Sequence, residues 1–225
     1  MEAITFLLGT IVLLRYIFKI DFKKAKELNS NKELEELTNK FPENIDIAKE
    51  MLEMLDNKKV KVEQAKNTET SLYIAVTNKI SIADMKNNYA RIQTIAHECM
   101  HSVQNRRLLL CNFIFSNINI IYIIAISILT HIGKIQNTML QLFILSLFLI
   151  IRFAVRSFLE IDAMTKARYF AEKYIRSKKI LTDDETEKLL KEYDKINEQG
   201  VPFMTVYILI SSLLWLLGYA FISVI

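Results

Sequence analysis

Apolar residues gather in four long stretches of the chain, and charged residues fill the segments between them. The stretches are Ala3–Ile17, Leu108–Thr130, Thr138–Ile151 and Phe203–Ile225. A transmembrane helix needs about 20 mostly apolar residues, so the second and fourth stretches fit well, while the first and third are short. The pattern predicts a mainly α-helical membrane protein with about four transmembrane helices. A soluble protein with buried helices is the alternative, but a core of this size would hardly hide the last, uncharged stretch.

The basic residues indicate on which side of the membrane each segment lies. Of the 29 Lys and Arg residues, 28 lie in residues 15–107 or 152–195, and Lys134 is the remaining one. Four spans would put both segments on the same side, which the positive-inside rule identifies as the cytoplasm. The net charge of +4 is then explained by topology and by attraction to membrane lipid. No basic stripe with interleaved aromatic residues occurs, so we expect no nucleic-acid partner.

The first apolar stretch is expected to be an uncleaved membrane anchor. It follows Glu2 rather than a basic residue, and no small-x-small cleavage pattern comes after it. The lysine-rich strip Lys19–Lys26 would then lie at the membrane surface. Cys99 and Cys111 are too few for a disulfide framework, and without a C-x-x-C pair they do not indicate a thiolate zinc site.

The chain is expected to divide into five segments. They are a first transmembrane helix (1–18), a cytoplasmic α+β part (19–107), a transmembrane helical hairpin (108–156), cytoplasmic helices (157–202) and a last transmembrane helix (203–225). Three short segments of the α+β part have the alternation or β-branched composition of strands, namely Lys59–Glu63, Ser71–Val76 and Ile80–Ile82. A turn-like triplet separates the last two, so the sequence predicts a small antiparallel sheet.

Helical spacing predicts the remaining elements. Helices are expected over Asn31–Lys40, Glu43–Asp56 and Glu160–Ser177. Asp84 is a candidate N-cap for a further helix, which could run straight into the second span. Thr182-Asp183-Asp184-Glu185 is a capping box that opens another helix, and Gly200 is expected to end it before the last span.

The most informative motif is His97-Glu98-Cys99-Met100-His101, an H-E-x-x-H pattern in a chain with only one other histidine. Residues four apart on a helix share a face, so both imidazoles can bind one metal ion. Glu98 is turned aside, where it can act as a general base on metal-activated water. An ordinary amphipathic helix with two solvated histidines is the alternative.

A catalytic zinc site usually has a third protein ligand. His131 is expected in the outer loop across the bilayer, so the third ligand should be a carboxylate, and Glu160 is the best candidate. If the helices are continuous, Glu160 and His101 would lie at similar heights beyond an antiparallel hairpin. Glu160 could instead be a surface carboxylate paired with Arg156. We therefore expect one Zn²⁺ per chain at His97, His101 and Glu160, although this ligand set would also accept other divalent ions.

The expected chemistry is hydrolysis of a polypeptide substrate. Glu98 would take a proton from the attacking water and could deliver one to the leaving amine. Arg168, Tyr169 and, more weakly, Tyr89 are candidates for stabilising the transition state, although each residue type more often packs or faces solvent. The Ser71–Val76 strand either binds an extended peptide by strand addition or is purely structural.

Two motifs carry a resemblance to a known family. Residues 96–104 match A-H-E-x-x-H-x-x-Q, and residues 160–167 follow E-x-D-A-S-x-x-A in all but one specified position. The sequence thereby resembles the membrane zinc metallopeptidases of the YugP-like type and, more loosely, the HtpX-like peptidases. The resemblance implies a gluzincin-like metallopeptidase domain in the bacterial cytoplasmic (inner) membrane, with the active site facing the cytoplasm.

The resemblance also implies roles for particular residues. His97, His101 and Glu160 would be metal ligands, Glu98 the base, and Asp162 a hydrogen-bond partner of a ligand histidine. The chain departs from the family pattern at Met100, where glycine is usual, at Ser102, where alanine is usual, and at Met164, where a hydroxyl residue is usual.

The leading hypothesis is thus a zinc endopeptidase that cleaves membrane or membrane-proximal proteins at the cytoplasmic face. An intramembrane protease of the site-two type would carry H-E-x-x-H within a span and often an Asp-Gly ligand motif, whereas here Asn and Arg flank the motif and no Asp-Gly exists. A non-catalytic membrane scaffold with a structural or degenerate metal site is the other alternative, and it predicts four protein ligands. The sequence contains no indication of an oligomeric state.

Overall fold

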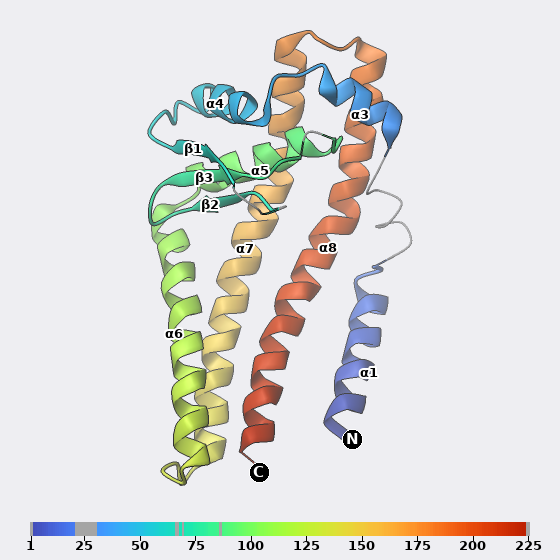
Figure 1. The fold of residues 1–225 in the computed structure, drawn as a ribbon. Helices are drawn as coiled ribbons and strands as arrows, with labels where there is room; N and C mark the ends of the chain where they lie inside the picture. Colours follow the sequence, from blue (N-terminus) through green and yellow to red (C-terminus); the bar gives the residue numbers. More distant parts are fainter. Residues whose placement is uncertain (1, 21–30, 66–67, 69, 86, 224–225) are drawn as a thin grey trace. The chain divides into compact units, whose positions relative to one another are not determined.

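The computed structural model describes residues 2–20, 31–65, 68, 70–85 and 87–223 (Figure 1). Most of the lysine-rich strip, residues 21–26, lies outside the described residues. The described helices are α1 (Glu2–Ile17), α3 (Lys32–Asn39), α4 (Asn44–Met54), α5 (Arg91–Val103), α6 (Arg106–His131), α7 (Thr138–Lys178) and α8 (Asp183–Ile222). The described strands are β1 (Lys61–Gln64), β2 (Leu72–Ile74) and β3 (Lys79–Ile82). The protein is therefore mainly helical, as predicted.

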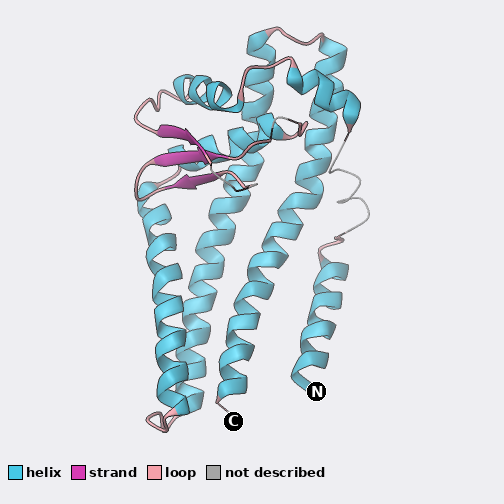
Figure 2. Ribbon diagram, in the orientation of Figure 1, coloured by secondary structure: helices cyan, strands magenta, loops and turns pink. Residues whose placement is uncertain are grey.

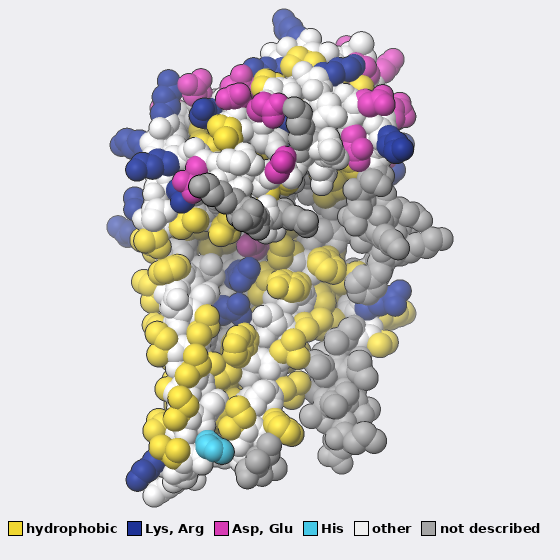
Figure 3. All heavy atoms as spheres, in the orientation of Figure 1, with side chains coloured by type: hydrophobic (Ala, Val, Ile, Leu, Met, Phe, Trp, Pro, Cys, Tyr) yellow, Lys and Arg dark blue, Asp and Glu magenta, His cyan; other side chains and the backbone are white. Residues whose placement is uncertain are grey.

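The chain forms two compact units. The first, here called the apolar unit, comprises Met1–Ile20, Arg107–Phe158 and Pro202–Ile225. The second, here called the α/β unit, comprises Asp21–Arg106 and Leu159–Val201. On the face shown in Figure 3, hydrophobic side chains cover the helices of the apolar unit, whereas charged side chains gather on the α/β unit.

Three helices, α6, α7 and α8, are long and apolar enough to cross a membrane. This finding identifies a membrane protein by length and composition, as the sequence predicted. The first of the four expected spans is shorter, because α1 has only 16 residues. Three of the four expected spans are therefore found among the described residues.

Within the apolar unit, α6 and α7 form an antiparallel hairpin around a short loop in which Gly133 has a φ of 68°. Tyr122 of α6 donates a hydrogen bond to Gln141 of α7 at 2.7 Å. Tyr219 of α8 packs against the same helix pair and lies 3.0 Å from the hydroxyl of Thr130. The hairpin loop, the start of α1 and the end of α8 lie at one end of this unit (Figure 1).

The two longest helices join elements that the sequence predicts as separate. The expected break at Gly200 is wrong, because α8 continues through Gly200 and contains Pro202. A Cβ at Gly200 would lie 2.9 Å from Cε of Met164, so this glycine makes room for the methionine side chain. The expected capping box is confirmed, because the Glu185 N–H donates to Thr182 Oγ1 and the Thr182 N–H donates to Glu185 Oε2.

The sheet of the α/β unit is mixed rather than antiparallel (Figure 2). Its strand order is β1-β3-β2, in which β2 and β3 form an antiparallel hairpin and β1 runs parallel to β3. The predicted all-antiparallel arrangement is wrong because β3, not β2, lies next to β1. The side chains of Ile80 and Ile82 are fully buried, so the most deeply buried strand takes the central place.

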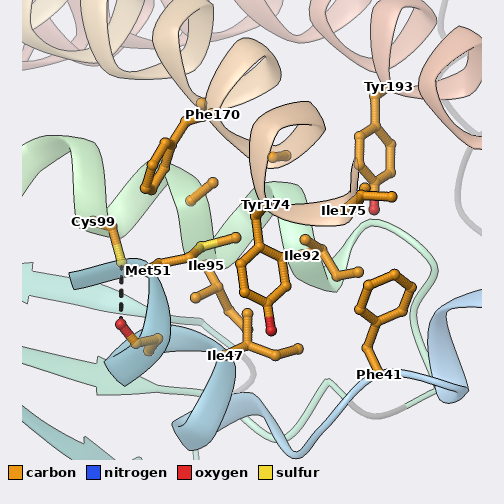
Figure 4. Packing of buried hydrophobic residues seen from close by; sticks show 14 of the residues in the cluster. Phe41, Ile47, Met51, Ile92, Ile95, Cys99, Phe170, Tyr174, Ile175 and Tyr193 are labelled. Carbon is orange, nitrogen blue, oxygen red and sulfur yellow. Dashed lines mark hydrogen bonds between the residues drawn. The ribbon is translucent and has the colours of Figure 1, made fainter. Parts of the chain in front are cut away.

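The core of the α/β unit fixes the position of α5 (Figure 4). Ile92, Ile95 and Cys99 form the buried stripe of this helix and pack in one cluster with Met51 of α4 and Tyr174 of α7. Since these side chains hold one face of α5 in the core, a different face of the helix is left for polar residues.

Arg91, the first residue of α5, is only 1% exposed. Its guanidinium donates hydrogen bonds to the carbonyl oxygens of Thr38, Phe41 and Pro42 and to Oδ1 of Asn44. The arginine thereby ties the loop between α3 and α4 to the start of the motif helix. Its five-donor fork suits this cluster of acceptors.

Candidate metal centre

The H-E-x-x-H motif lies in the second half of α5. His97 and His101 are one turn apart, and their Nε2 atoms are 3.1 Å apart. The helix ends at Val103, and Gln104 has an extended ψ of 165°. Since α6 begins only at Arg106, this helix does not run straight into the second span, as it could have done.

Glu160 of α7 lies against both imidazoles. Its Oε2 is 3.4 Å from Nε2 of His97 and 3.7 Å from Nε2 of His101. Donor atoms of the three residues all lie within 4.8 Å of one another, so the group could hold a metal ion. Within the part of the chain that the structure describes, this group comprises these three residues.

The spacing of the three donors matches the requirements of a tetrahedral ion. Zinc lies about 2.0–2.2 Å from nitrogen and oxygen ligands, so two ligand atoms of a tetrahedral site are about 3.3 Å apart. The three pairwise distances of 3.1, 3.4 and 3.7 Å lie on both sides of that value. Two imidazoles and one carboxylate are a donor set that could hold a divalent metal ion.

The three side chains are largely buried, with 19%, 12% and 18% exposed for His97, His101 and Glu160. Burial alone would raise the pKa of Glu160, but hydrogen bonds and positive charge from His101 and His97 outweigh it and hold that pKa well below its usual range. Burial alone would lower the pKa of His101, but Glu160, Glu98 and Gln104 raise it. Glu160 and His101 therefore favour each other's charged forms.

Gln104 connects one ligand to the helix that carries another. Its Nε2 donates to the Leu159 carbonyl oxygen and to Asp162 Oδ2, both at 2.8 Å. Its Oε1 must then be the acceptor for Nδ1 of His101, which lies 2.8 Å away. A proton on Nδ1 leaves the Nε2 lone pair of a neutral imidazole for the metal.

Asp162, the candidate hydrogen-bond partner of a ligand histidine, is linked to His101 through the Gln104 side chain. Its other carboxylate oxygen lies 2.6 Å from Lys166 Nζ. Asp162 is two residues from Glu160 and so points to a different side of α7. Gln104 is the last residue of the A-H-E-x-x-H-x-x-Q pattern, and that position was the signal in the sequence for its role.

Glu98 is 6% exposed and lies beside the sheet. Its Oε2 accepts a hydrogen bond of 2.6 Å from the backbone N–H of Tyr73 in β2. Burial raises the pKa of Glu98, while His97, His101 and the Tyr73 N–H act in the opposite direction. The net rise makes Glu98 a better proton acceptor than an exposed glutamate.

The structure also places the other candidate residues. His131 ends α6 and is exposed, and it does not belong to the group of three metal-ligand candidates. Arg168 pairs with Asp194 and Glu172, and Tyr169 is exposed. Tyr89 is buried in the core, where burial raises its pKa to about 12. Among the described residues, none of the four belongs to the group of metal-ligand candidates.

Comparisons with protein-family models, with curated proteins and with solved structures found no match to the chain. The helix that bears the motif is not among the three described helices that could span a membrane. The three metal-ligand candidates, two on this helix and one on α7, all belong to the α/β unit.

Proposed function

We propose that this protein is a membrane-bound, zinc-dependent endopeptidase that cleaves membrane or membrane-proximal proteins at the cytoplasmic face. One observation carries the proposal: the two motif histidines and Glu160 converge at tetrahedral spacing, with Glu98 on the same helix. The family resemblance of the two motifs supports the same activity, with one zinc ion per chain.

A zinc ion, when bound, supplies a Lewis acid that lowers the pKa of water to about 7 and polarises a carbonyl group. The Glu98 carboxylate accepts the proton of the attacking water. As the tetrahedral species collapses, the protonated Glu98 returns that proton to the leaving amine nitrogen. Both steps use Oε1 of Glu98, because Oε2 accepts the hydrogen bond from the Tyr73 N–H and is held in place by it.

The edge of the sheet offers a binding surface for an extended polypeptide. β2 is an edge strand, and its partner β3 lies on only one side. Because the Tyr73 N–H binds Glu98, Tyr73 directs its backbone groups away from β3, in keeping with the alternation of antiparallel ladders. An extended substrate added along this edge would lie next to the general base.

The membrane location of the substrate is inferred from the chain itself. Three long apolar helices tether the α/β unit to a bilayer. The distribution of basic residues favours the cytoplasm for this unit. Proteins held in or near the same membrane would therefore be the substrates that reach the site most often.

The direct test is a Glu98→Gln variant assayed with a fluorescently labelled, unfolded casein in detergent. The amide cannot accept the proton, so we expect cleavage to fall at least about a hundredfold while zinc content stays at one per chain. Glu53→Gln, an exposed glutamate on α4, is the matched control and should cleave at the wild-type rate. Equal cleavage by the Glu98→Gln and wild-type proteins would contradict the proposal.

A further inference from the structure

A cavity with several polar side chains in a mostly apolar lining lies among the helices of the apolar unit. It has a volume of about 220 Å³ and is lined by side chains of α6, α7 and α8. Its polar lining includes Ser116 and Asn119 of α6 and Arg152 and Arg156 of α7. None of these residues belongs to the metal group, and all lie within the apolar unit.

Arg152 lies where a membrane helix would normally carry an apolar residue. It is 14 residues from the start of α7, about 21 Å along a helix, and thus within a hydrocarbon layer of about 30 Å. Its Nη1 atom is buried and has no hydrogen-bond partner among the described residues. Residues 107–158 and 202–225 contain no Asp or Glu, so these parts of the apolar unit offer this guanidinium no anion.

Asn119 presents the complementary group. Its side chain is 6% exposed, and its Nδ2 points to the Phe148 carbonyl oxygen at 3.5 Å. Its Oδ1 is buried with no partner among the described residues. The cavity therefore holds a cationic donor and a neutral acceptor that are both unsatisfied, and such groups are costly inside a membrane unless something binds them.

The cavity can be reached from the surface that would face lipid. Ile120 and Trp215 form part of its lining, and both are exposed. Other exposed apolar side chains of α7 include Phe143 and Ile150. Acyl chains could pack on these side chains while a headgroup enters the cavity.

We propose that this cavity binds the headgroup of an anionic phospholipid that carries hydroxyl groups, such as phosphatidylglycerol. The phosphate accepts hydrogen bonds from Arg152, and a headgroup hydroxyl donates to Oδ1 of Asn119. Basic pockets between transmembrane helices are a recurrent form of lipid-headgroup site. This site is independent of the proposed peptidase activity.

The test compares lipid binding by the full-length wild-type, Arg152→Gln and Asn119→Leu proteins in a neutral detergent. Phosphatidylglycerol, phosphatidylcholine and soluble glycerol 3-phosphate are added separately, and bound lipid is counted by native mass spectrometry alongside the thermal unfolding midpoint. We expect phosphatidylglycerol alone to bind and to raise the midpoint of the wild type. Its affinity should fall about tenfold or more in Arg152→Gln, because hydrogen bonds to charged groups are lost, and by a smaller factor in Asn119→Leu.

Lys134→Gln is the matched control, because Lys134 is the exposed basic residue of the hairpin loop and does not line the cavity. It should bind phosphatidylglycerol as the wild type does. Equal binding of phosphatidylglycerol by Arg152→Gln and wild type, or equal binding of the two phospholipids by wild type, would overturn the proposal. Equal stabilisation by glycerol 3-phosphate would also overturn it, since the occupant would then be a soluble phosphoester.

Discussion

The backbone N–H of Tyr73 donates a 2.6 Å hydrogen bond to Oε2 of Glu98 and so joins the edge strand β2 to the motif helix α5. The bond fixes the carboxylate of the proposed general base without using any side chain of the strand.

Removing this donor should slow peptide hydrolysis. Tyr73→Pro deletes the N–H, and since that group points away from β3, the ladder between β2 and β3 loses no bond. A hydrogen bond to a charged group contributes about 1.5–3 kcal/mol, so we expect kcat/KM to fall about tenfold or more with zinc content unchanged. Tyr73→Phe, which removes only the hydroxyl group that donates to Asn78, should keep the wild-type kcat/KM. A Tyr73→Pro enzyme with wild-type kcat/KM would show that the bond does not position the base.

Gln104→Ala should weaken zinc binding. The substitution removes the acceptor that holds a proton on Nδ1 of His101 and the link from that histidine to α7. Loss of such supporting hydrogen bonds typically reduces metal affinity about 10–100-fold. Competition with a coloured chelator measures the dissociation constant directly. Gln64→Ala, at an exposed position of β1, is the control and should bind zinc as tightly as wild type. Unchanged affinity in Gln104→Ala would remove this residue from the account.

Glu50 should make stability depend on pH in the acid range. Burial alone would raise its pKa, but hydrogen bonds from Lys178 and Tyr174 outweigh that effect and lower the pKa below its ordinary value of 4.5. A depressed carboxyl pKa stabilises the folded state above pH 4.5, and this stabilisation is lost as the pH falls through the folded-state value.

The variant that isolates this effect is Glu50→Gln. Since the Glu50 side chain is partly exposed, we expect a loss of only about 0.5–1 kcal/mol at pH 7, which is roughly 1–4 °C in the unfolding midpoint. The difference from wild type should shrink between pH 4.5 and pH 3. Glu53→Gln, at an exposed position on α4, should have the unfolding midpoint of the wild type at every pH from 7 to 3. A difference that grows as the pH falls would have the wrong sign for this mechanism.

The parts of the structure that the sequence predicts are those with local signals. The spacing of His97 and His101 requires only a helix to place both imidazoles together, and the Thr182–Glu185 capping box is complete within four residues. An antiparallel hairpin of two spans predicts that Glu160 lies near His101. Glu160 does reach both histidines, even though the helix ends between α5 and α6.

The features that escaped prediction depend on contacts between residues far apart in the chain. The parallel pairing of β1 with β3 follows from which strand is buried most deeply, and short strands carry no local mark of that order. Gly200 looks like a helix end in sequence, but in the structure it accommodates Met164 of another helix. The Tyr73 N–H has no side-chain signature at all, since every residue except proline carries one.

The measurement that tests the central claim most directly is the zinc content of the detergent-purified protein, determined for wild type, Glu160→Ala and His131→Ala. The proposed metal centre predicts one zinc ion per chain in the wild type, its loss in Glu160→Ala, and its retention in His131→Ala, because His131 lies outside the group of three. Zinc that stays bound in Glu160→Ala, or a wild-type protein that binds none, would contradict the ligand set and with it the proposed peptidase.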